Sequence, residues 1–499
     1  MTDAYQKLAA YARETAILAS AGSLLDWDQQ TYMPSGAAES RAEQIGMIAM
    51  LVHTRRTCAA MRDRIEEAEA SGLDPQSAHA ASVREFRIDF DRAVRLPSEL
   101  VGELARVTSQ AQQAWKRARA ADAFASFAPW LERVIGLCRT KAACYGTPVG
   151  GEPYDALLNE YEPAATAAQI EAVFTPLRDR LSRLLVELRQ GKDPAPIKIK
   201  AEAARQHDFG LYVIESIGFD LARGRLDTTA HPFCQDIGPD DVRLTTRYRE
   251  EHFTDGLYGT LHEAGHGLYE QGLPRDAHFG EPLAQSISLG IHESQSRLWE
   301  NWVGRSLEFW TWALPHAASI MSAELSSYLP EQVYRAVNTA RPSLIRVEAD
   351  EATYNLHVMI RFELERALFR QEIEARDIPG LWNEMYAALL GLTPPDDTRG
   401  CLQDVHWSAG LLGYFPTYTL GNLYMAQFME QAERDIPGLK AGFCAGSFAA
   451  LLEWLRANIH RHGRRYRASE LCERVTGMPL SADPLLRYLE SKLRPIYSC

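Results

Sequence analysis

Residues 255–272 read DGLYGTLHEAGHGLYEQG and contain the pattern His262-Glu263-x-x-His266. Residues four positions apart on a helix lie one turn above each other, so His262 and His266 can offer two imidazole nitrogens to one metal ion. Glu263 lies one position round the helix, next to the place of a metal-bound water. Two ligands and a general base in this spacing are typical of zinc peptidases. The stretch therefore predicts a metal-binding helix.

The ends of this helix and the segment before it also carry signals. Asp255 is the expected N-cap, and Gly272 with Pro274 supplies the stop. Residues 241–248 (DVRLTTRY) alternate in a way that predicts a strand. An exposed edge strand beside a metal helix could hold an extended peptide by main-chain pairing. The alternative is a short structural ribbon.

A third metal ligand is expected downstream. Residues 282–303 are predicted to form a second helix, and Glu293 lies in its middle. A carboxylate there would complete a two-histidine, one-glutamate site with one open position, the pattern of catalytic zinc. The alternative is an ordinary glutamate that faces solvent. The other candidates within reach are Asp276, His278, Glu281 and His292.

Several further motifs run in order along nearly the whole chain. They are LDWDQQTYMP at 25–34, GAA at 36–38, RAEQ at 41–44, HPF at 231–233, DxRxT at 241–245, HESQ at 292–295, RVEADE at 346–351 and GxxQDxHW at 400–407. Together with HExxH they resemble the thermostable carboxypeptidase Taq family of metallocarboxypeptidases. The resemblance implies a mainly α fold, a homodimer, and stepwise removal of C-terminal amino acids from peptides with a free C-terminus. It also implies that Glu293 is the third ligand of a Zn²⁺ or Co²⁺ ion.

A weaker similarity links the chain to the peptidyl-dipeptidases that include angiotensin-converting enzyme. It implies that His231 binds the peptide backbone. It also implies that His406, with Tyr414 or Tyr418, donates hydrogen bonds to the tetrahedral oxyanion. The alternatives are a turn residue at His231, a core histidine at His406, and ordinary packed aromatics at the two tyrosines.

Recognition of a terminal carboxylate suits arginine, whose planar fork binds carboxylates with two hydrogen bonds. Arg346 is the first candidate and Arg361 the second. The alternative for both is a structural ion pair with the nearby acids Glu348, Asp350 and Glu351. The family resemblance also gives the HPF motif and the residues Asp241 and Arg243 a part in binding the substrate, by narrowing the closed end of the cleft.

These assignments predict a mechanism in which Glu263 takes a proton from zinc-activated water and returns it to the leaving amine. Two other activities could use the same metal site, those of an endo-acting oligopeptidase and of a dipeptidyl carboxypeptidase. A non-catalytic helical scaffold stabilised by zinc is the alternative from another class, but such a scaffold has no use for Glu263.

Composition narrows the class of partner. The chain has 499 residues, is 46% hydrophobic and carries a net charge of −13, which allows a large core and argues against nucleic acid as a partner. Its N-terminus has no apolar signal core, and no run of 18 apolar residues is present, so a cytoplasmic protein without a membrane partner is expected. Eight cysteines without a CxxC pair predict reduced thiols.

Helical periodicity dominates the rest of the chain, at residues 9–25, 39–52, 97–121, 167–188, 345–372 and 420–433. We therefore expect a mainly α fold, a single large helical domain over 1–499 with two lobes around a deep active-site cleft. A small β-ribbon is expected beside the metal helix. Residues 1 to about 100 are expected to form a helical lid-like region, and the metal-binding core is expected over about 230–420.

Overall fold

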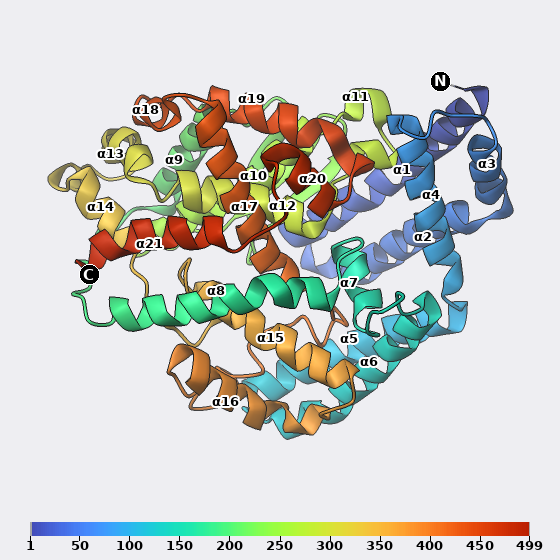
Figure 1. Ribbon diagram of the computed structural model, residues 1–499, viewed down its shortest axis with the longest axis horizontal. Helices are drawn as coiled ribbons and strands as arrows, with labels where there is room; N and C mark the ends of the chain where they lie inside the picture. The colour runs from blue at the N-terminus through green and yellow to red at the C-terminus, as the bar shows by residue number, and fades with distance from the viewer. Residues whose placement is uncertain (1, 499) are drawn as a thin grey trace. The chain divides into compact units, whose positions relative to one another are not determined.

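The computed structural model describes residues 2–498, and nearly all of its regular structure is helical (Figure 1). The mainly α fold expected from the sequence is confirmed. In chain order the helices are α1 (Asp3–Thr31), α2 (Ala38–Thr57), α3 (Ala59–Glu69), α4 (Ala78–Arg95), α5 (Ser98–Ala120), α6 (Phe124–Tyr145), α7 (Asp155–Tyr161), α8 (Ala167–Leu188), α9 (Ala203–Ser216), α10 (Phe253–Gly272), α11 (Arg275–His278), α12 (Leu289–Arg297), α13 (Leu307–Ile320), α14 (Pro330–Val337), α15 (Tyr354–Phe369), α16 (Ile378–Leu390), α17 (Pro416–Asp435), α18 (Leu439–Cys444), α19 (Ala449–Asn458), α20 (Ala468–Thr476) and α21 (Asp483–Tyr497).

The chain folds into two compact units, each assembled from three stretches of sequence. The first unit comprises Met1–Ala93, Ala195–Val337 and Met425–Pro479, and the second comprises Val94–Pro194, Asn338–Tyr424 and Leu480–Cys499. The HExxH helix therefore belongs to the first unit, and the motifs at 346–351 and 400–407 belong to the second. The lid-like role expected for residues 1 to about 100, and the single domain over 1–499, stay predictions.

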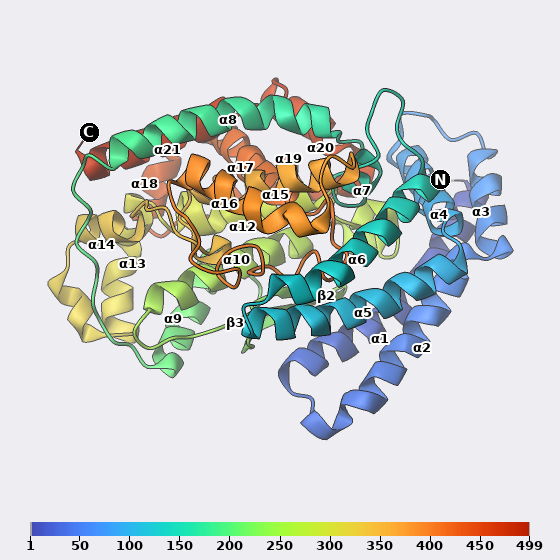
Figure 2. The same ribbon diagram turned by 90° about the horizontal axis from the view of Figure 1, so that it is seen from below.

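In the first unit, α1 and α2 lie side by side (Figure 1, Figure 2). The N-terminal motifs explain this hairpin, because Arg41 of α2 donates to the Leu25 carbonyl at 2.8 Å and pairs with Asp28 at 2.8 Å. The α1 helix extends beyond the predicted range of 9–25 at both ends. Apolar residues of α1, α3 and α4 form a shared core, which contains Tyr5, Leu8, Ile65, Val83, Phe86 and Phe90.

A three-stranded sheet, β1 (Gly224–Thr228), β2 (Cys234–Gly238) and β3 (Asp241–Thr246), also belongs to the first unit. The predicted strand at 241–248 is confirmed as β3, but its assignment as an edge strand is wrong. β3 is central, because it pairs in parallel with β1 and antiparallel with β2. β1 is short and polar (GRLDT), so no alternation marked it in advance. Thr260 of α10 donates to Thr246 of β3 at 3.2 Å, which places the sheet against the HExxH helix as expected.

In the second unit, α5 and α6 pack along each other (Figure 2), and α15 is buried over nearly its whole length. A single helix over 345–372 was predicted, but α15 begins only at Tyr354. Asp350 explains the later start, because its carboxylate accepts hydrogen bonds from the backbone nitrogens of Ala352 and Thr353 at 2.9 and 3.0 Å. Such a turn competes with the helix and sets where it begins.

Between residues 2 and 498, none of the helices combines the length and apolar character needed to span a lipid bilayer. The cysteines at positions 58, 138, 144, 234, 401, 444 and 472 are free thiols. Cys499 lies outside the described residues.

Candidate active site

The HExxH motif lies on α10 (Phe253–Gly272), whose C-terminal end is where the sequence predicted it. The predicted N-cap is wrong. The helix begins two residues before Asp255, and the cap position is held by His252 without a side-chain hydrogen bond. Asp255 instead lies in the first turn, where Arg249 pairs with its carboxylate. Phe253 is buried, so the helix starts where an apolar side chain can pack.

The glycine inside the motif allows a second helix to approach. A Cβ atom on Gly265 would lie 2.5 Å from the carbonyl oxygen of Gln295 and 2.6 Å from the Cα of Ser296. Because only hydrogen fits in this space, α12 can pack directly against α10. Instead of the continuous helix predicted over 282–303, this region contains a 3-10 turn (Pro282–Ala284), α12 (Leu289–Arg297) and a π-helical turn (Leu298–Val303).

The close packing brings two histidines and one glutamate together. The Nε2 atoms of His262 and His266 lie 3.6 and 3.5 Å from Oε2 of Glu293. Ligand atoms bound to one tetrahedral zinc ion at about 2.0–2.1 Å lie about 3.4 Å apart, so this spacing fits a shared metal ion. Among residues 2–498, this is the group of three histidine, cysteine or carboxylate side chains that is close enough to hold a metal.

Hydrogen bonds orient both imidazole rings. Nδ1 of His262 donates to Oε2 of Glu300 at 2.9 Å, and Nδ1 of His266 donates to the carbonyl oxygen of His292 at 3.1 Å. Each Nε2 atom is thereby left with its lone pair for a metal. A histidine ligand almost always has such a partner on its other nitrogen, because the hydrogen bond fixes the tautomer and the ring orientation.

The carboxylate of Glu293 is held in the same way. Oε1 accepts from Nε of Arg297 at 2.7 Å, and Oε2 accepts from the hydroxyl of Ser296 at 3.2 Å. Although burial opposes ionisation, Arg297 and His262 hold the pKa of Glu293 well below its usual range. Glu293 is therefore anionic at neutral pH, as a metal ligand must be.

The local electrostatics favour a cation between the ligands. Burial and the neighbouring His292 lower the pKa of His266 to about 3, which keeps this imidazole neutral. Burial alone would also lower the pKa of His262, but the Glu293 carboxylate and the hydrogen bond to Glu300 raise it to about 9. The carboxylates of Glu293 and Glu300 thus stabilise one positive charge at this position, and a metal ion would supply that charge in place of the proton.

Glu263 lies next to the ligands with 7% of its surface exposed. Burial raises its pKa to about 7, while the positive charge of His262 opposes this shift. A carboxylate with a pKa near the working pH can both accept and return a proton, which is the behaviour of a general base and acid.

The other candidate ligands are engaged elsewhere. Nε2 of His292 lies 2.7 Å from Oε1 of Glu270, and the His292 ring stacks on His266 with the centroids 4.3 Å apart. Glu281 accepts hydrogen bonds from the hydroxyl of Tyr5 and from Nδ1 of His278, the latter at 3.1 Å. Asp276 belongs to no metal-sized group among residues 2–498.

The motifs at 231–233 and 241–245 are joined in the sheet. The hydroxyl of Thr245 accepts from the backbone nitrogen of Phe233 at 2.8 Å, and Nε and Nη2 of Arg243 both donate to Asp241 at 2.8 Å. The Arg243 guanidinium also lies 4.2 Å from the ring centroid of Trp27, which belongs to the N-terminal motif. His231 is exposed. Three motifs that are distant in sequence are therefore in contact within the first unit.

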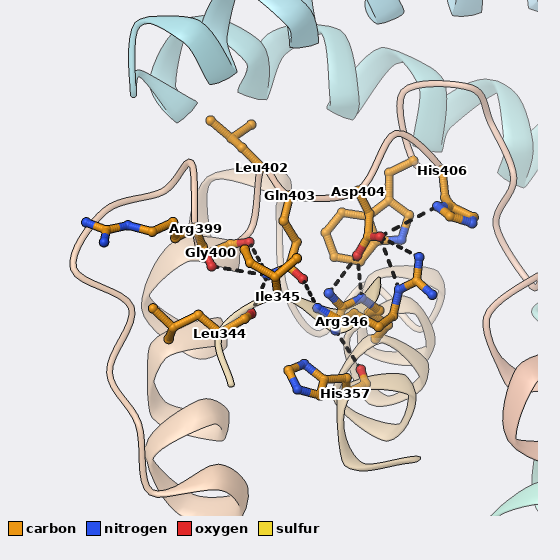
Figure 3. Close-up of polar contacts among 12 residues, drawn as sticks. Leu344, Ile345, Arg346, His357, Arg399, Gly400, Leu402, Gln403, Asp404 and His406 are labelled. Atoms are coloured by element: carbon orange, nitrogen blue, oxygen red, sulfur yellow. Dashed lines mark hydrogen bonds and ion pairs between the residues drawn. The ribbon is translucent and has the colours of Figure 1, made fainter. Parts of the chain in front are cut away.

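The two candidate carboxylate-binding arginines lie together in the second unit, because both pair with Asp404. Figure 3 shows Arg346 and Asp404 in this cluster. Arg346 donates to Oδ1 of Asp404 through Nε at 3.1 Å and Nη2 at 2.8 Å. Arg361 donates to Oδ2 of the same aspartate through Nε at 2.7 Å. Two of the expected alternative partners are used elsewhere, because Asp350 accepts hydrogen bonds from the backbone nitrogens of Ala352 and Thr353 and Glu351 pairs with Lys492 at 2.7 Å.

The proposed oxyanion donors are close to this cluster. Nε2 of His406 lies 3.1 Å from the hydroxyl of Tyr418 on α17. Burial, together with Arg346 and Arg361, lowers the pKa of His406 to about 4 even though Asp404 opposes the shift. His406 is therefore neutral at pH 7 and shares a hydrogen bond with Tyr418. The ring centroid of Tyr414 lies 5.5 Å from the ring centroid of His406 and 5.2 Å from that of Tyr161.

Two residues with a part in these sites were not singled out by the sequence. Glu300 holds His262, and its position two helical turns after Glu293 is a signal that the two share a face. Gln403 belongs to a quoted motif, but nothing local shows that its side chain reaches Arg346.

A metal-sized group of two histidines and a glutamate, with a buried carboxylate beside it, defines a metallopeptidase-type centre. The family model described as carboxypeptidase Taq (M32) metallopeptidase matches residues 7–493, and the chain belongs to this family. It is 48% identical to thermostable carboxypeptidase 1 of Thermus thermophilus, with 99% of each chain covered. It is 39% identical to thermostable carboxypeptidase 1 of Pyrococcus furiosus, with 98% of this chain and 97% of that protein covered.

Solved structures agree with the family assignment. A crystal structure of an M32 carboxypeptidase from Deinococcus radiodurans R1 matches with a TM-score of 0.96 at 43% identity, covering 100% of both chains. A structure of the Pyrococcus furiosus carboxypeptidase matches with a TM-score of 0.95 at 36% identity, covering 99% of both chains. The chain is therefore a peptidase of the carboxypeptidase type from a metal-dependent family.

Proposed function

We propose that the protein is a zinc metallocarboxypeptidase that hydrolyses the last peptide bond and releases C-terminal amino acids. One observation carries the proposal. His262, His266 and Glu293 present their donor atoms to one point, with the buried Glu263 carboxylate beside them. This donor set is that of catalytic rather than structural zinc, because it leaves one coordination position for water.

Glu263 performs the proton transfers in this mechanism. A bound Zn²⁺ supplies Lewis-acid chemistry, lowering the pKa of a water molecule towards about 7 and polarising the substrate carbonyl. Glu263 accepts a proton from the attacking water and later returns it to the leaving amine. Its raised pKa of about 7 suits both steps. His262, His266 and Glu293 hold the ion, and their own hydrogen bonds prevent them from turning away.

His406 and Tyr418 are the proposed donors to the tetrahedral oxyanion. Both carry polar hydrogens, and their mutual hydrogen bond at 3.1 Å fixes their relative orientation. Tyr414 is the second candidate for the same role. Preorganised donors stabilise negative charge in the transition state more strongly than water does, because they do not reorganise during the reaction.

Arg346 is the proposed site for the substrate's terminal carboxylate. Arg346 keeps 4% of its surface exposed whereas Arg361 keeps none, so Arg346 is the more accessible of the two. His231, Asp241 and Arg243 are proposed to contact the substrate as well. Asp241 and Arg243 form an ion pair at 2.8 Å, and His231 is exposed on the segment that leads into β2.

Zn²⁺ is the proposed native metal, with Co²⁺ as the alternative, because two imidazoles and one carboxylate suit either ion. A homodimer is proposed as the solution state. Elemental analysis of the purified protein would identify the metal, and sedimentation equilibrium would give the mass of the assembly, for which a value near twice 56.0 kDa is expected.

Product analysis tests the activity. A peptide with a free C-terminus should give a ladder of products shortened by one residue at a time, seen by mass spectrometry. The same peptide with a C-terminal amide should be resistant. An endo-acting oligopeptidase would cleave the amide internally, and a dipeptidyl carboxypeptidase would shorten the free peptide by two residues at a time. A scaffold protein would leave both peptides intact.

A further inference from the structure

Asp404 is shared by two buried arginines in the second unit. Its Oδ1 atom accepts from Nε and Nη2 of Arg346, and its Oδ2 atom accepts from Nε of Arg361 (Figure 3). Burial opposes ionisation of this carboxyl group, yet the two guanidinium groups hold the pKa of Asp404 far below its usual range. The contacts are therefore charge-assisted at any pH at which the protein works.

The loop that carries Asp404 is fixed by its neighbour. Oε1 of Gln403 accepts from the backbone nitrogen of Arg346 at 2.8 Å, and Nε2 of Gln403 donates to the carbonyl oxygen of Leu344 at 3.0 Å. Figure 3 shows Gln403 and Asp404 side by side against the segment from Leu344 to Arg346. The motifs at 346–351 and 400–407 are thus joined by backbone contacts next to the Arg346–Asp404 ion pair.

The hydrogen bonds of Arg346 leave one defined part of its guanidinium unused. Of its five N–H hydrogens, one on Nε and one on Nη2 bind Asp404, and one on Nη1 binds the hydroxyl of Tyr354 at 2.9 Å. One hydrogen on Nη1 and one on Nη2 have no partner among the described residues. Because Asp404 takes the Nε edge, the unused Nη2 hydrogen lies on the end of the guanidinium, where an Nη1 hydrogen and an Nη2 hydrogen together can bind a carboxylate with two parallel hydrogen bonds.

Arg361 offers no such edge. Its side chain is fully buried, its Nη1 atom donates to the carbonyl oxygen of His357 at 2.7 Å, and its guanidinium lies 4.4 Å from the ring centroid of Trp382. Arg361 therefore supplies a second positive charge, which binds Oδ2 of Asp404, the oxygen that Arg346 does not use. With one carboxylate between two guanidinium groups, this three-residue cluster is left with an excess positive charge, which favours an incoming anion.

We propose that Asp404 is a positioning residue for the carboxypeptidase reaction, holding Arg346 by its Nε edge so that the opposite end of the guanidinium is presented to the terminal carboxylate of the substrate. The inference rests on the proposed function, in which Arg346 binds that carboxylate. It assigns specificity for a free C-terminus to an aspartate that does not itself touch the substrate. Without Asp404, the guanidinium would keep its charge but lose its fixed orientation.

The test compares Asp404→Asn with a matched control, Asp350→Asn. Both aspartates are half-buried in the second unit, but the Asp350 carboxylate accepts hydrogen bonds from the backbone nitrogens of Ala352 and Thr353, whereas the Asp404 carboxylate accepts them from Arg346. For each protein, inhibition by an N-acetyl amino acid is compared with inhibition by the corresponding N-acetyl amino acid amide. The ratio of the two inhibition constants measures carboxylate recognition alone. Steady-state kinetics on a peptide with a free C-terminus give kcat and KM separately.

In Asp404→Asn we expect the preference for the carboxylate inhibitor to fall by at least about tenfold, with KM rising more than kcat falls. Asp350→Asn should keep the wild-type ratio even if it unfolds at a lower temperature. If Asp404→Asn does not yield folded protein, the same ratio of inhibition constants is measured for Asp404→Glu. This variant keeps the charge but displaces the guanidinium by one methylene, so the preference for the carboxylate inhibitor should also fall. A wild-type ratio in a folded Asp404 variant would overturn the proposal.

The same measurements separate this inference from the proposed function. If the wild-type protein binds the amide inhibitor as tightly as the acid, or hydrolyses amidated peptides, the exopeptidase assignment itself fails. If the wild type discriminates and the Asp404 variants discriminate equally well, only the positioning role fails.

Discussion

Glu300 accepts a hydrogen bond from Nδ1 of His262 at 2.9 Å, and this contact determines which nitrogen of the first ligand faces the metal position. Glu300 lies in the π-helical turn Leu298–Val303 that follows α12, and its other carboxylate contacts come from Arg297 at 3.2 Å and Arg305 at 3.5 Å. Single π-helical turns often occur at functional sites, because the extra residue redirects side chains. The π-helical turn thus places Glu300 where it can orient His262, one of the expected metal ligands.

Replacing Glu300 should weaken metal binding without removing a ligand. We expect Glu300→Gln to lower the metal affinity by about 10- to 100-fold, since the acceptor for His262 loses its charge. Activity should recover largely when the metal is in excess. Competition with a chromophoric chelator gives the affinity, and the exposed Glu324→Gln serves as a control. Equal affinities in the two variants would show that Glu300 does not support the site.

Glu263 should be essential for turnover but dispensable for the metal. Glu263→Gln keeps nearly the same volume and leaves the ligands intact, so the metal content measured by elemental analysis should not change. The loss of a general base should lower kcat by about 100- to 10,000-fold. Hydrolysis at the wild-type rate by a metal-loaded Glu263→Gln protein would refute the mechanism.

Gly265 should tolerate no larger side chain. In Gly265→Ala the new methyl group would overlap the Gln295 carbonyl and the Ser296 Cα atom, which are backbone atoms of α12 and cannot turn aside. We expect a loss of stability of about 1–3 kcal/mol from overpacking and a weaker metal site, since Glu293 moves with α12.

Gly259→Ala is the matched control on the same helix. A Cβ atom there would lie 3.4 Å from the hydroxyl of Thr246, so only a small adjustment is needed. Alanine is favoured over glycine within a helix by about 1 kcal/mol, so this variant should be as stable as the wild type or more stable. Compared with the wild type, Gly265→Ala should therefore unfold at a lower temperature and bind the metal more weakly. Gly259→Ala should unfold at the same or a higher temperature. Thermal unfolding and metal titration of the two variants measure these differences.

Asp404 should contribute to stability in a way that depends on pH. Its pKa in the folded protein lies below the unfolded value of about 3.9, so the unfolded chain binds the proton first as pH falls. The stabilisation is therefore fully present above about pH 5 and decreases as the pH falls towards the folded pKa.

Asp404→Asn removes this titration. Breaking a buried ion pair costs about 3–5 kcal/mol, so the variant should be less stable than the wild type at pH 7, and the difference should narrow below about pH 4. Denaturant unfolding of both proteins between pH 3 and pH 7 measures it. A difference that is independent of pH would mean that the charge of Asp404 is not what stabilises the cluster.

The sequence predicted the parts of the site that depend on local spacing. His262 and His266 are one helical turn apart, and Glu293 follows on the next helix, so periodicity and reach bring all three to one place. Arg346 shows the limit of such reasoning. Three acids lie within five residues of it, yet its partner is Asp404, 58 positions away.

The physical reason is that nearby acids can have other uses. Asp350 is closer in sequence to Arg346 than Asp404 is, but its carboxylate is occupied by the backbone at the start of α15. Ion pairs between loops depend on how the loops pack, and packing leaves no periodic trace in the sequence. The same holds for β1, which made β3 a central strand, and for the π-helical turn that places Glu300.

The two tyrosines proposed for the oxyanion should differ in their contribution. The Tyr418 hydroxyl is hydrogen-bonded to His406, while the Tyr414 ring packs edge-on against Tyr161 with the centroids 5.2 Å apart. Tyr418→Phe should lower kcat by about 100- to 1,000-fold, the usual cost of losing one oxyanion donor, with little change in KM. Tyr414→Phe should have a much smaller effect on kcat. The reverse order would assign the oxyanion contact to Tyr414, and equal small effects would leave His406 as the donor, which His406→Gln kinetics would then have to support.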